Sequence, residues 1–182
     1  MTFKIRSATL EDIPALGQLI ASSSRGLGTP WYTPQQIEGA LQGAFGVDAS
    51  LIRDGTYFVV VAPSGELVGC GGWGRRRTLF GSSARAERDE STLDPHTEPA
   101  RIRAFFVLPE HARHGLGRLL LERSEQAARE AGFSAMELMA TLSGIPFYER
   151  CGYTRRQALD YPLPGGLVLP MVAMYKRIAP GV

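Results

Sequence analysis

Apolar and polar residues follow periodic patterns that predict strands and helices along most of the chain. Residues 3–6 alternate as an edge strand does, and Thr9 with Asp12 forms the capping-box pattern that precedes a helix. Thr33 followed by Pro34 marks a second helix start, because proline at the first helical position gives up no backbone hydrogen bond. This first part of the chain therefore predicts one strand and two helices.

The middle of the chain predicts a hairpin and then a long connection. Residues 56–73 contain two apolar runs around the turn-forming residues 63–66, which is typical of paired antiparallel strands. Residues 75–100 show no sustained periodicity, and connections of that length are usually functional or mobile. We expect a long loop on the substrate side, with a mobile segment as the alternative.

The remaining residues predict four strands and two helices, and complete a single domain over residues 1–182. The first of these helices begins near Gly115 and ends at Gly132, a residue suited to the left-handed end of a helix. The order of elements, without an internal repeat, predicts an α/β fold with seven strands and about four helices. In chain order the other elements are strand 101–107, strand 135–140, helix 145–152 and strands 153–163 and 167–177.

Composition excludes several classes of protein. Of the 182 residues, 44% are hydrophobic and 21% charged, which is ordinary for a globular domain and excludes disorder and collagen-like structure. A net charge of +2 is too small for a dedicated nucleic-acid binder. No apolar stretch approaches membrane-spanning length and no secretory signal is visible, so we expect a cytoplasmic protein without membrane contact. The only cysteines, Cys70 and Cys151, are expected to be core residues.

The run from Pro109 to Glu122, PEHARHGLGRLLLE, joins a strand to a helix through a glycine turn. This arrangement presents unpaired backbone N–H groups and the positive end of a helix dipole to an anion, and phosphate is the expected guest. The alternative is that the glycines only start a helix. Leu120 stands where a dinucleotide fingerprint needs its third glycine, and no Walker loop is present.

That run and the later FYERCGY together resemble the GCN5-related N-acetyltransferase family, close to its little-characterised bacterial members. The resemblance implies a mostly antiparallel seven-stranded sheet in which strands four and five are parallel and splayed, with acetyl-coenzyme A as cosubstrate. Two positions depart from the family pattern. Ala112 stands where Gln or Arg is usual, and the segment TLSG, with Ser143, replaces an asparagine.

The resemblance also assigns roles to residues. It implies a bulge near residues 105–107, a backbone N–H of Phe105 or Phe106 facing the thioester carbonyl, and Tyr148 assisting the departing thiolate. The alternative for Tyr148 is a packing residue of a short helix. The residues expected to contact the cofactor are Phe105, Phe106, Val107, Ala112, Arg113, His114, Gly115, Leu116, Gly117, Arg118, Ser143 and Tyr148.

A general base and an acceptor pocket are less strongly indicated. Glu98 is the first candidate for the base, with His96 and Asp94 beside it, and each could instead be a solvated loop residue. An acceptor amine of low pKa would need no strong base. The arginines 75–77 could bind an acidic acceptor, or could be solvated. The aromatic residues in the family's acceptor positions, which could equally be packing residues, are Trp31, Tyr32, Trp73 and Phe80.

The expected function is transfer of an acetyl group from acetyl-coenzyme A to a primary amine of a small molecule or amino acid. The alternatives are a non-catalytic acyl-coenzyme A sensor and an N-acetyltransferase for proteins or peptides. His111, His114 and His96 could be combined into a metal site, but the resemblance calls for no metal and none is expected. A homodimer through the final strands is an open expectation.

Overall fold

The computed structural model describes residues 2–85 and 88–178. One seven-stranded sheet runs through it in the order β1-β2-β3-β4-β5-β7-β6. Only β4 and β5 are parallel neighbours, and the other pairs are antiparallel. The strands are β1 (Lys4–Ser7), β2 (Tyr57–Val61), β3 (Leu67–Gly74), β4 (Ala100–Val107), β5 (Ala135–Thr141), β6 (Thr154–Pro162) and β7 (Val168–Arg177).

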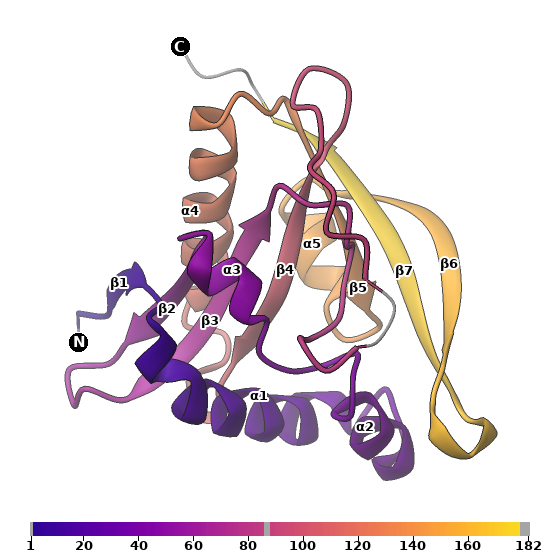
Figure 1. Cartoon of the computed structure of the whole chain (residues 1–182). Coiled ribbons are helices and arrows are strands. Elements are labelled where there is room, and N and C mark those ends of the chain that lie inside the picture. The colour runs from indigo at the N-terminus through magenta and orange to yellow at the C-terminus, as the bar shows by residue number, and fades with distance from the viewer. Residues whose placement is uncertain (1, 86–87, 179–182) are drawn as a thin grey trace.

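Helices cover both faces of this sheet. Figure 1 shows α1 and α2 along one face and α4 and α5 on the other. No helix in the described ranges is both long and apolar enough to cross a bilayer. The α-helices are α1 (Ile13–Gly28), α2 (Pro34–Ala40), α3 (Ala49–Arg53), α4 (Leu116–Glu130) and α5 (Ile145–Arg150).

The helix starts follow the expected capping chemistry. Thr9 N–H donates to the Asp12 carboxylate at 2.8 Å, completing the capping box ahead of α1. Thr33 Oγ1 accepts from Gln36 N–H at 3.2 Å at the start of α2. The prediction of about four helices missed α3, which is too short to show a helical period. Its only local signal is Asp48, whose carboxylate caps Ser50 N–H at 3.0 Å.

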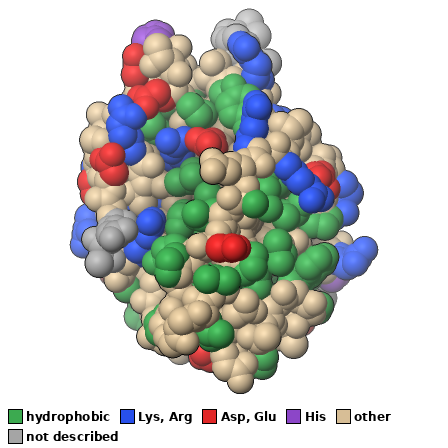
Figure 2. Space-filling view, turned by 90° about the vertical axis from the view of Figure 1, so that its right-hand side faces the viewer, with side chains coloured by type: hydrophobic (Ala, Val, Ile, Leu, Met, Phe, Trp, Pro, Cys, Tyr) green, Lys and Arg blue, Asp and Glu red, His purple; other side chains and the backbone are tan. Residues whose placement is uncertain are grey.

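β6 is an edge strand that no helix covers on the side shown in Figure 2, where hydrophobic side chains gather around an acidic one. Leu159, Leu167 and Val168 are more than a third exposed on β6, β7 and the turn between them. The opposite edge strand, β1, is much shorter, with four residues. Exposed apolar side chains therefore gather at the C-terminal hairpin.

The parallel pair β4 and β5 separates soon after it starts. The two strands are in register only at Ala100 with Met136 and at Arg101 with Glu137. Past these positions β4 has a strand partner on the β3 side alone, so its backbone groups facing β5 need other partners. The splay implied by the family resemblance is therefore present, and it opens the sheet at its centre.

Candidate active site between the splayed strands

A cavity of 640 Å³ fills the gap between β4 and β5. This volume lies in the range of small-molecule sites. Its walls come from both faces of the sheet, since α1 and the loop after it line one side and the start of α4 with α5 lines the other. A ligand in the cavity would thus pass between two groups of helices.

The start of α4 has the geometry of an anion cradle. Arg113 and Gly115 have left-handed backbones, with φ of 65° and 81°, so successive N–H groups turn toward one point. The first bond from the helix is donated by Leu119 N–H to Gly115 O at 3.0 Å, and the N–H groups before it are left for a ligand. Glycine suits position 115 because residues with a Cβ rarely adopt this positive φ. Crowding is not the reason, since a Cβ there would meet no atom within 4 Å.

Most of the expected phosphate-loop residues line this end of the cavity: Ala112, Arg113, Gly115, Leu116, Gly117 and Arg118. His114 is not among the lining residues, and its Nδ1 lies 3.0 Å from Ala112 O. His111 lines the cavity although it was not assigned to the cofactor, and its ring packs edge-on against Phe3. The described residues contain no group of three His, Cys, Asp or Glu side chains able to hold a metal.

A bulge in β4 forms the middle of the cavity. Arg103 lies opposite Gly72 and Phe106 opposite Cys70, so Ala104 and Phe105 together face one residue of β3. The bulge was expected at residues 105–107, and it lies slightly earlier because Ala104 takes the left-handed conformation, with φ of 53°. Phe105, Phe106 and Val107 all line the cavity, as expected.

Glycine at position 71 allows this bulge. A Cβ built on Gly71 would lie 2.6 Å from the ring of Phe105, which real side chains do not tolerate. The ring of Phe105 therefore occupies space that only glycine leaves open. Bulges of this kind redirect backbone N–H groups away from the ladder, and this one lies where β4 has parted from β5.

Tyr148 lines the cavity from α5. Its ring is buried in an aromatic cluster, with edge contacts to Phe147 at 5.0 Å, Tyr153 at 5.7 Å and Phe105 at 6.4 Å between ring centres. Burial raises the pKa of the Tyr148 hydroxyl well above its usual value, so the group stays protonated. No hydrogen bond from this hydroxyl to the described residues is found, which leaves its proton available to a ligand.

Three of the four aromatic candidates for the acceptor pocket are in the cavity wall: Trp31, Tyr32 and Phe80. The Tyr32 hydroxyl donates to Pro170 O at 2.7 Å and accepts from Leu142 N–H at 2.9 Å. These bonds tie the loop after α1 to the ends of β5 and β7. Ser143 also lines the cavity, with its hydroxyl 3.1 Å from Thr141 Oγ1.

The assignment of Trp73 to the acceptor pocket is corrected by the structure. Trp73 is buried in the core, outside the cavity wall, and packs edge-on against Phe133 with 5.9 Å between ring centres. Its place in β3 follows from the sheet register, in which it pairs with Ile102. Alternation along β3 therefore turns the indole toward the core.

The structure also places Glu98 outside the cavity. Its carboxylate accepts from Asp94 N–H at 2.8 Å and is paired with Arg77. These contacts, first the backbone bond and then the arginine, hold the pKa of Glu98 below its usual range. A carboxylate of lowered pKa that lies away from the cavity cannot serve as the base for a bound amine.

The neighbours of Glu98 do not replace it. His96 and Asp94 lie in the same turn and are also absent from the cavity wall. The neighbouring arginines are used in ion pairs: Arg76 contacts Asp54 at 2.9 Å, and Arg77 contacts Glu98. The solvated-turn interpretation of residues 75–77 therefore describes them better than acceptor binding.

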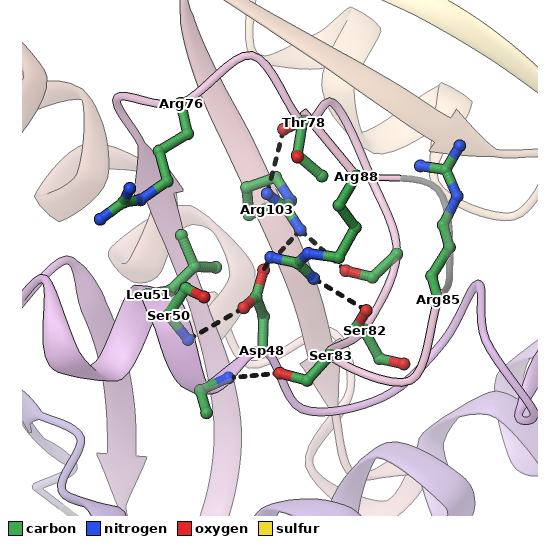
Figure 3. A network of polar contacts seen from close by, with 12 residues as sticks. Asp48, Ser50, Leu51, Arg76, Thr78, Ser82, Ser83, Arg85, Arg88 and Arg103 are labelled. Atoms are coloured by element: carbon green, nitrogen blue, oxygen red, sulfur yellow. Dashed lines mark hydrogen bonds and ion pairs between the residues drawn. The ribbon is translucent and has the colours of Figure 1, made fainter. Parts of the chain in front are cut away.

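A buried ion network holds the long loop in place, and sequence reasoning missed it. Figure 3 shows Asp48 between Arg103 of β4 and Arg88 of the loop. Asp48 Oδ2 accepts from Arg103 at 2.7 Å and from Arg88 at 2.9 Å, and the Asp48 side chain is fully buried. Arg103 also donates to Thr78 O at 3.0 Å and Gly81 O at 2.7 Å. The described parts of loop 75–99 are thus fastened to the strand that carries the bulge.

A comparison with known families decides the affiliation. The model of the family described as Acetyltransferase (GNAT) family matches residues 22–153, which include the end of α1, the phosphate loop and α5. The chain belongs to the GNAT acetyltransferase family. The expected family and its mixed-sheet fold are therefore confirmed.

Among curated proteins, this GNAT chain is similar to an acetyltransferase of Bacillus subtilis, with 29% identity over 42% of this chain and 50% of the relative. The chain spans about half the length of the curated relatives it matches. Among solved structures it is similar to a GCN5-related N-acetyltransferase from Rhodopseudomonas palustris, with a TM-score of 0.73, 18% identity and coverage of 98% and 97% of the two chains. It is also similar to YncA of Salmonella typhimurium, solved with acetyl-coenzyme A, with a TM-score of 0.64, 18% identity and coverage of 100% and 97%.

Proposed function

We propose that this GNAT protein transfers an acetyl group from acetyl-coenzyme A to a primary amine of a small molecule or amino acid. The observation that carries the proposal is the single cavity that joins the N–H cradle of α4 to the free hydroxyl of Tyr148. A diphosphate and a thioester, which the pantetheine arm joins in one cosubstrate, each have a matching group there. The similarity to a structure solved with acetyl-coenzyme A supports the same cosubstrate.

The residues at the start of α4 would hold the diphosphate. The N–H groups of residues 115–118 point along the helix axis, and the positive end of the dipole adds to their attraction for phosphate. Arg113 and Arg118 line the same end and supply positive charge. Ala112 lacks the side chain of the Gln or Arg that is usual at this position. Its absence removes one hydrogen-bond donor at most, because this cradle is built from the backbone.

The splayed strands would hold the pantetheine arm. β4 has unpaired backbone groups on the side of β5, and an arm with two amides can satisfy them as a strand would. The bulge at Ala104 and Phe105 would supply an N–H on the side of the gap, where it would stabilise negative charge on the thioester oxygen during attack.

Tyr148 would assist the leaving group. The amine nitrogen attacks the thioester carbon, the carbon–sulfur bond breaks, and the sulfur leaves with the electron pair of that bond. The Tyr148 hydroxyl, kept protonated by its burial, donates a hydrogen bond to the departing sulfur. The proton lost by the amine ends on the sulfur, so that free thiol and amide are the products.

A non-catalytic acyl-coenzyme A sensor is the second candidate. It is favoured by Ala112 and by the lack of any carboxylate among the described residues that line the cavity. A sensor would bind the acyl form and release no thiol, whereas the enzyme releases one thiol for each amide formed. A peptide acceptor, the third alternative, would give turnover with lysine peptides.

Calorimetry with acetyl-coenzyme A and a thiol-release assay test the proposal together. The variant Gly117→Ala places a methyl group in the cradle, 3.3 Å from the ring of Phe147, and we expect it to weaken binding about tenfold. Gly17→Ala is the matched control, since Gly17 lies exposed in α1 with no atom near its Cβ. Equal binding by both variants, or no binding by the wild type, would contradict the phosphate assignment.

A further inference from the structure

The part of the cavity remote from α4 is apolar. Its wall contains Trp31 and Tyr32 from the loop after α1, Phe45 from the segment before α3, and Leu79 with Phe80 from the long loop. Phe45 packs edge-on against Phe106, with 5.9 Å between ring centres, so this wall adjoins the bulged part of β4. An acceptor attacking a thioester at the bulge would lie against these rings.

Contacts to β4 and β6 fix most of these rings. Arg103, next to the bulge, donates to the backbone of Thr78 and Gly81 and so holds the segment that carries Leu79 and Phe80. Phe80 packs edge-on against Tyr161 with 5.2 Å between ring centres. Trp31 is the exception, because half of its surface is exposed at the rim of the cavity. An apolar ligand would cover it.

The charges of the cavity do not suit a cationic acceptor. Among the described residues of its wall there is no aspartate or glutamate, and the arginines that line it are Arg113, Arg118 and Arg150. The carboxylate of Asp48, near the bulge, is buried and already paired with two arginines. An alkylammonium group entering this site would lose its hydration and find no carboxylate among the described lining residues to pair with.

The same wall lacks a group to remove a proton from an ammonium ion. His111, the one histidine among the described lining residues, packs against Phe3 beside the phosphate loop. Glu98 lies outside the cavity. The acceptor nitrogen must therefore arrive as the neutral amine, which at pH 7 favours amines of low pKa.

Resting on the proposed function, we infer that the acceptor is an apolar, weakly basic amine of the arylamine class, whose ring packs against Trp31, Tyr32 and Phe80. The neutral nitrogen attacks the thioester carbon, the carbon–sulfur bond breaks, and the proton shed by the nitrogen ends on the sulfur, directly or through Tyr148. Polyamines and lysine side chains are poor acceptors for the same site, because both are cationic and would lose their hydration on entering it.

A matched set of amines tests this inference with wild-type protein and saturating acetyl-coenzyme A. 4-Methylaniline and benzylamine are close in size and differ in basicity, while spermidine and a lysine tripeptide carry the disfavoured charge. We expect kcat/KM at pH 7 for 4-methylaniline to exceed that for spermidine and the peptide by about tenfold or more. Benzylamine should gain activity with rising pH in step with its neutral fraction, because the site has no base to assist.

Two variants locate the binding surface. Trp31→Ala should lower kcat/KM for 4-methylaniline about tenfold and leave calorimetric binding of coenzyme A unchanged. Leu10→Ala is the control, because Leu10 is an equally exposed apolar residue outside the cavity wall. An unchanged kcat/KM for Trp31→Ala would overturn the assignment of this wall.

The outcomes also separate this inference from the proposed function. Turnover of spermidine or the lysine peptide ahead of both aromatic amines would overturn the acceptor class and leave the acetyltransferase proposal standing. Binding of acetyl-coenzyme A without thiol release on any amine would overturn both and favour the sensor. Turnover of 4-methylaniline in preference to the cationic amines would support both.

Discussion

The hydroxyl of Tyr57 donates a 2.8 Å hydrogen bond to the carbonyl of Ala104, the left-handed residue of the β4 bulge. Tyr57 is fully buried in β2, two strands away from the gap between β4 and β5. A non-glycine residue at positive φ is uncommon and is held by its surroundings. This bond is thus one of the contacts that keep the bulge in shape.

Removing that bond should loosen the bulge. We expect Tyr57→Phe to lower the free energy of unfolding by about 1 to 2 kcal/mol, because the carbonyl of Ala104 loses its buried donor. We also expect kcat to fall about tenfold with a smaller change in KM, because the N–H aimed at the thioester oxygen is less well placed. Urea unfolding and thiol release measure the two effects. Tyr175→Phe is the control, since the Tyr175 hydroxyl makes no hydrogen bond to the described residues. Equal effects of both variants would contradict the role of Tyr57 in holding the bulge.

The ion pair between Asp48 and Arg103 is a second support, and its loss should affect stability strongly. In Asp48→Asn the guanidinium of Arg103, only 2% exposed, would remain buried without its counter-charge. We expect a loss of about 3 kcal/mol in the free energy of unfolding, measured in urea. Glu38→Gln breaks the exposed pair with Arg25 and should change the urea midpoint little. Similar midpoints for the two variants would count against a stabilising role for the buried network.

Tyr148→Phe tests the proposed role of the Tyr148 hydroxyl as the hydrogen-bond donor to the departing sulfur. The substitution keeps the ring in its aromatic cluster and removes the hydroxyl that this residue brings to the cavity. We expect turnover to fall about 100-fold, while calorimetric affinity for coenzyme A and the urea midpoint stay close to those of the wild type. Undiminished turnover would remove Tyr148 from the mechanism and leave it as a packing residue.

The two cysteines should differ in reactivity. Cys70 has no exposed surface, and burial raises its pKa to about 12, whereas Cys151 is partly exposed and lines the cavity. We expect iodoacetamide to label Cys151 alone, as read by peptide mass spectrometry. Burial also raises the pKa of Cys151, so its labelling rate should climb about tenfold for each pH unit from 7 to 9, as the thiolate fraction grows.

Ligand protection extends that experiment. Under the proposed function coenzyme A would fill the cavity that Cys151 lines, so we expect a coenzyme A analogue without its thiol to slow the labelling. Labelling of Cys70 at a comparable rate would show that the core opens readily. Labelling of Cys151 that is indifferent to the analogue would place the ligand elsewhere.

The features that could be predicted from the sequence are those set by neighbouring residues. The helix caps at Thr9 and Thr33 and the left-handed Gly132 are local choices of side chain and backbone, and each is found where the pattern indicated. The position of the bulge was missed slightly, because it depends on which residues of β3 lie opposite β4. The wrong assignment of Trp73 to the acceptor pocket has the same origin, since the sheet register turns its side chain to the core.

By itself, the sequence determined the order of the strands and of every α-helix except α3, the glycine turn that can hold an anion, and the tyrosine carried by the short helix after β5. Only the tertiary structure decided that Asp48 pairs with Arg103 and that Glu98 lies outside the cavity. It also decided that aromatic residues line the cavity and that no carboxylate is among the described lining residues. The physical reason is distance along the chain. Backbone conformation and capping depend on adjacent residues, whereas burial and charge pairing depend on which remote segments the sheet brings together.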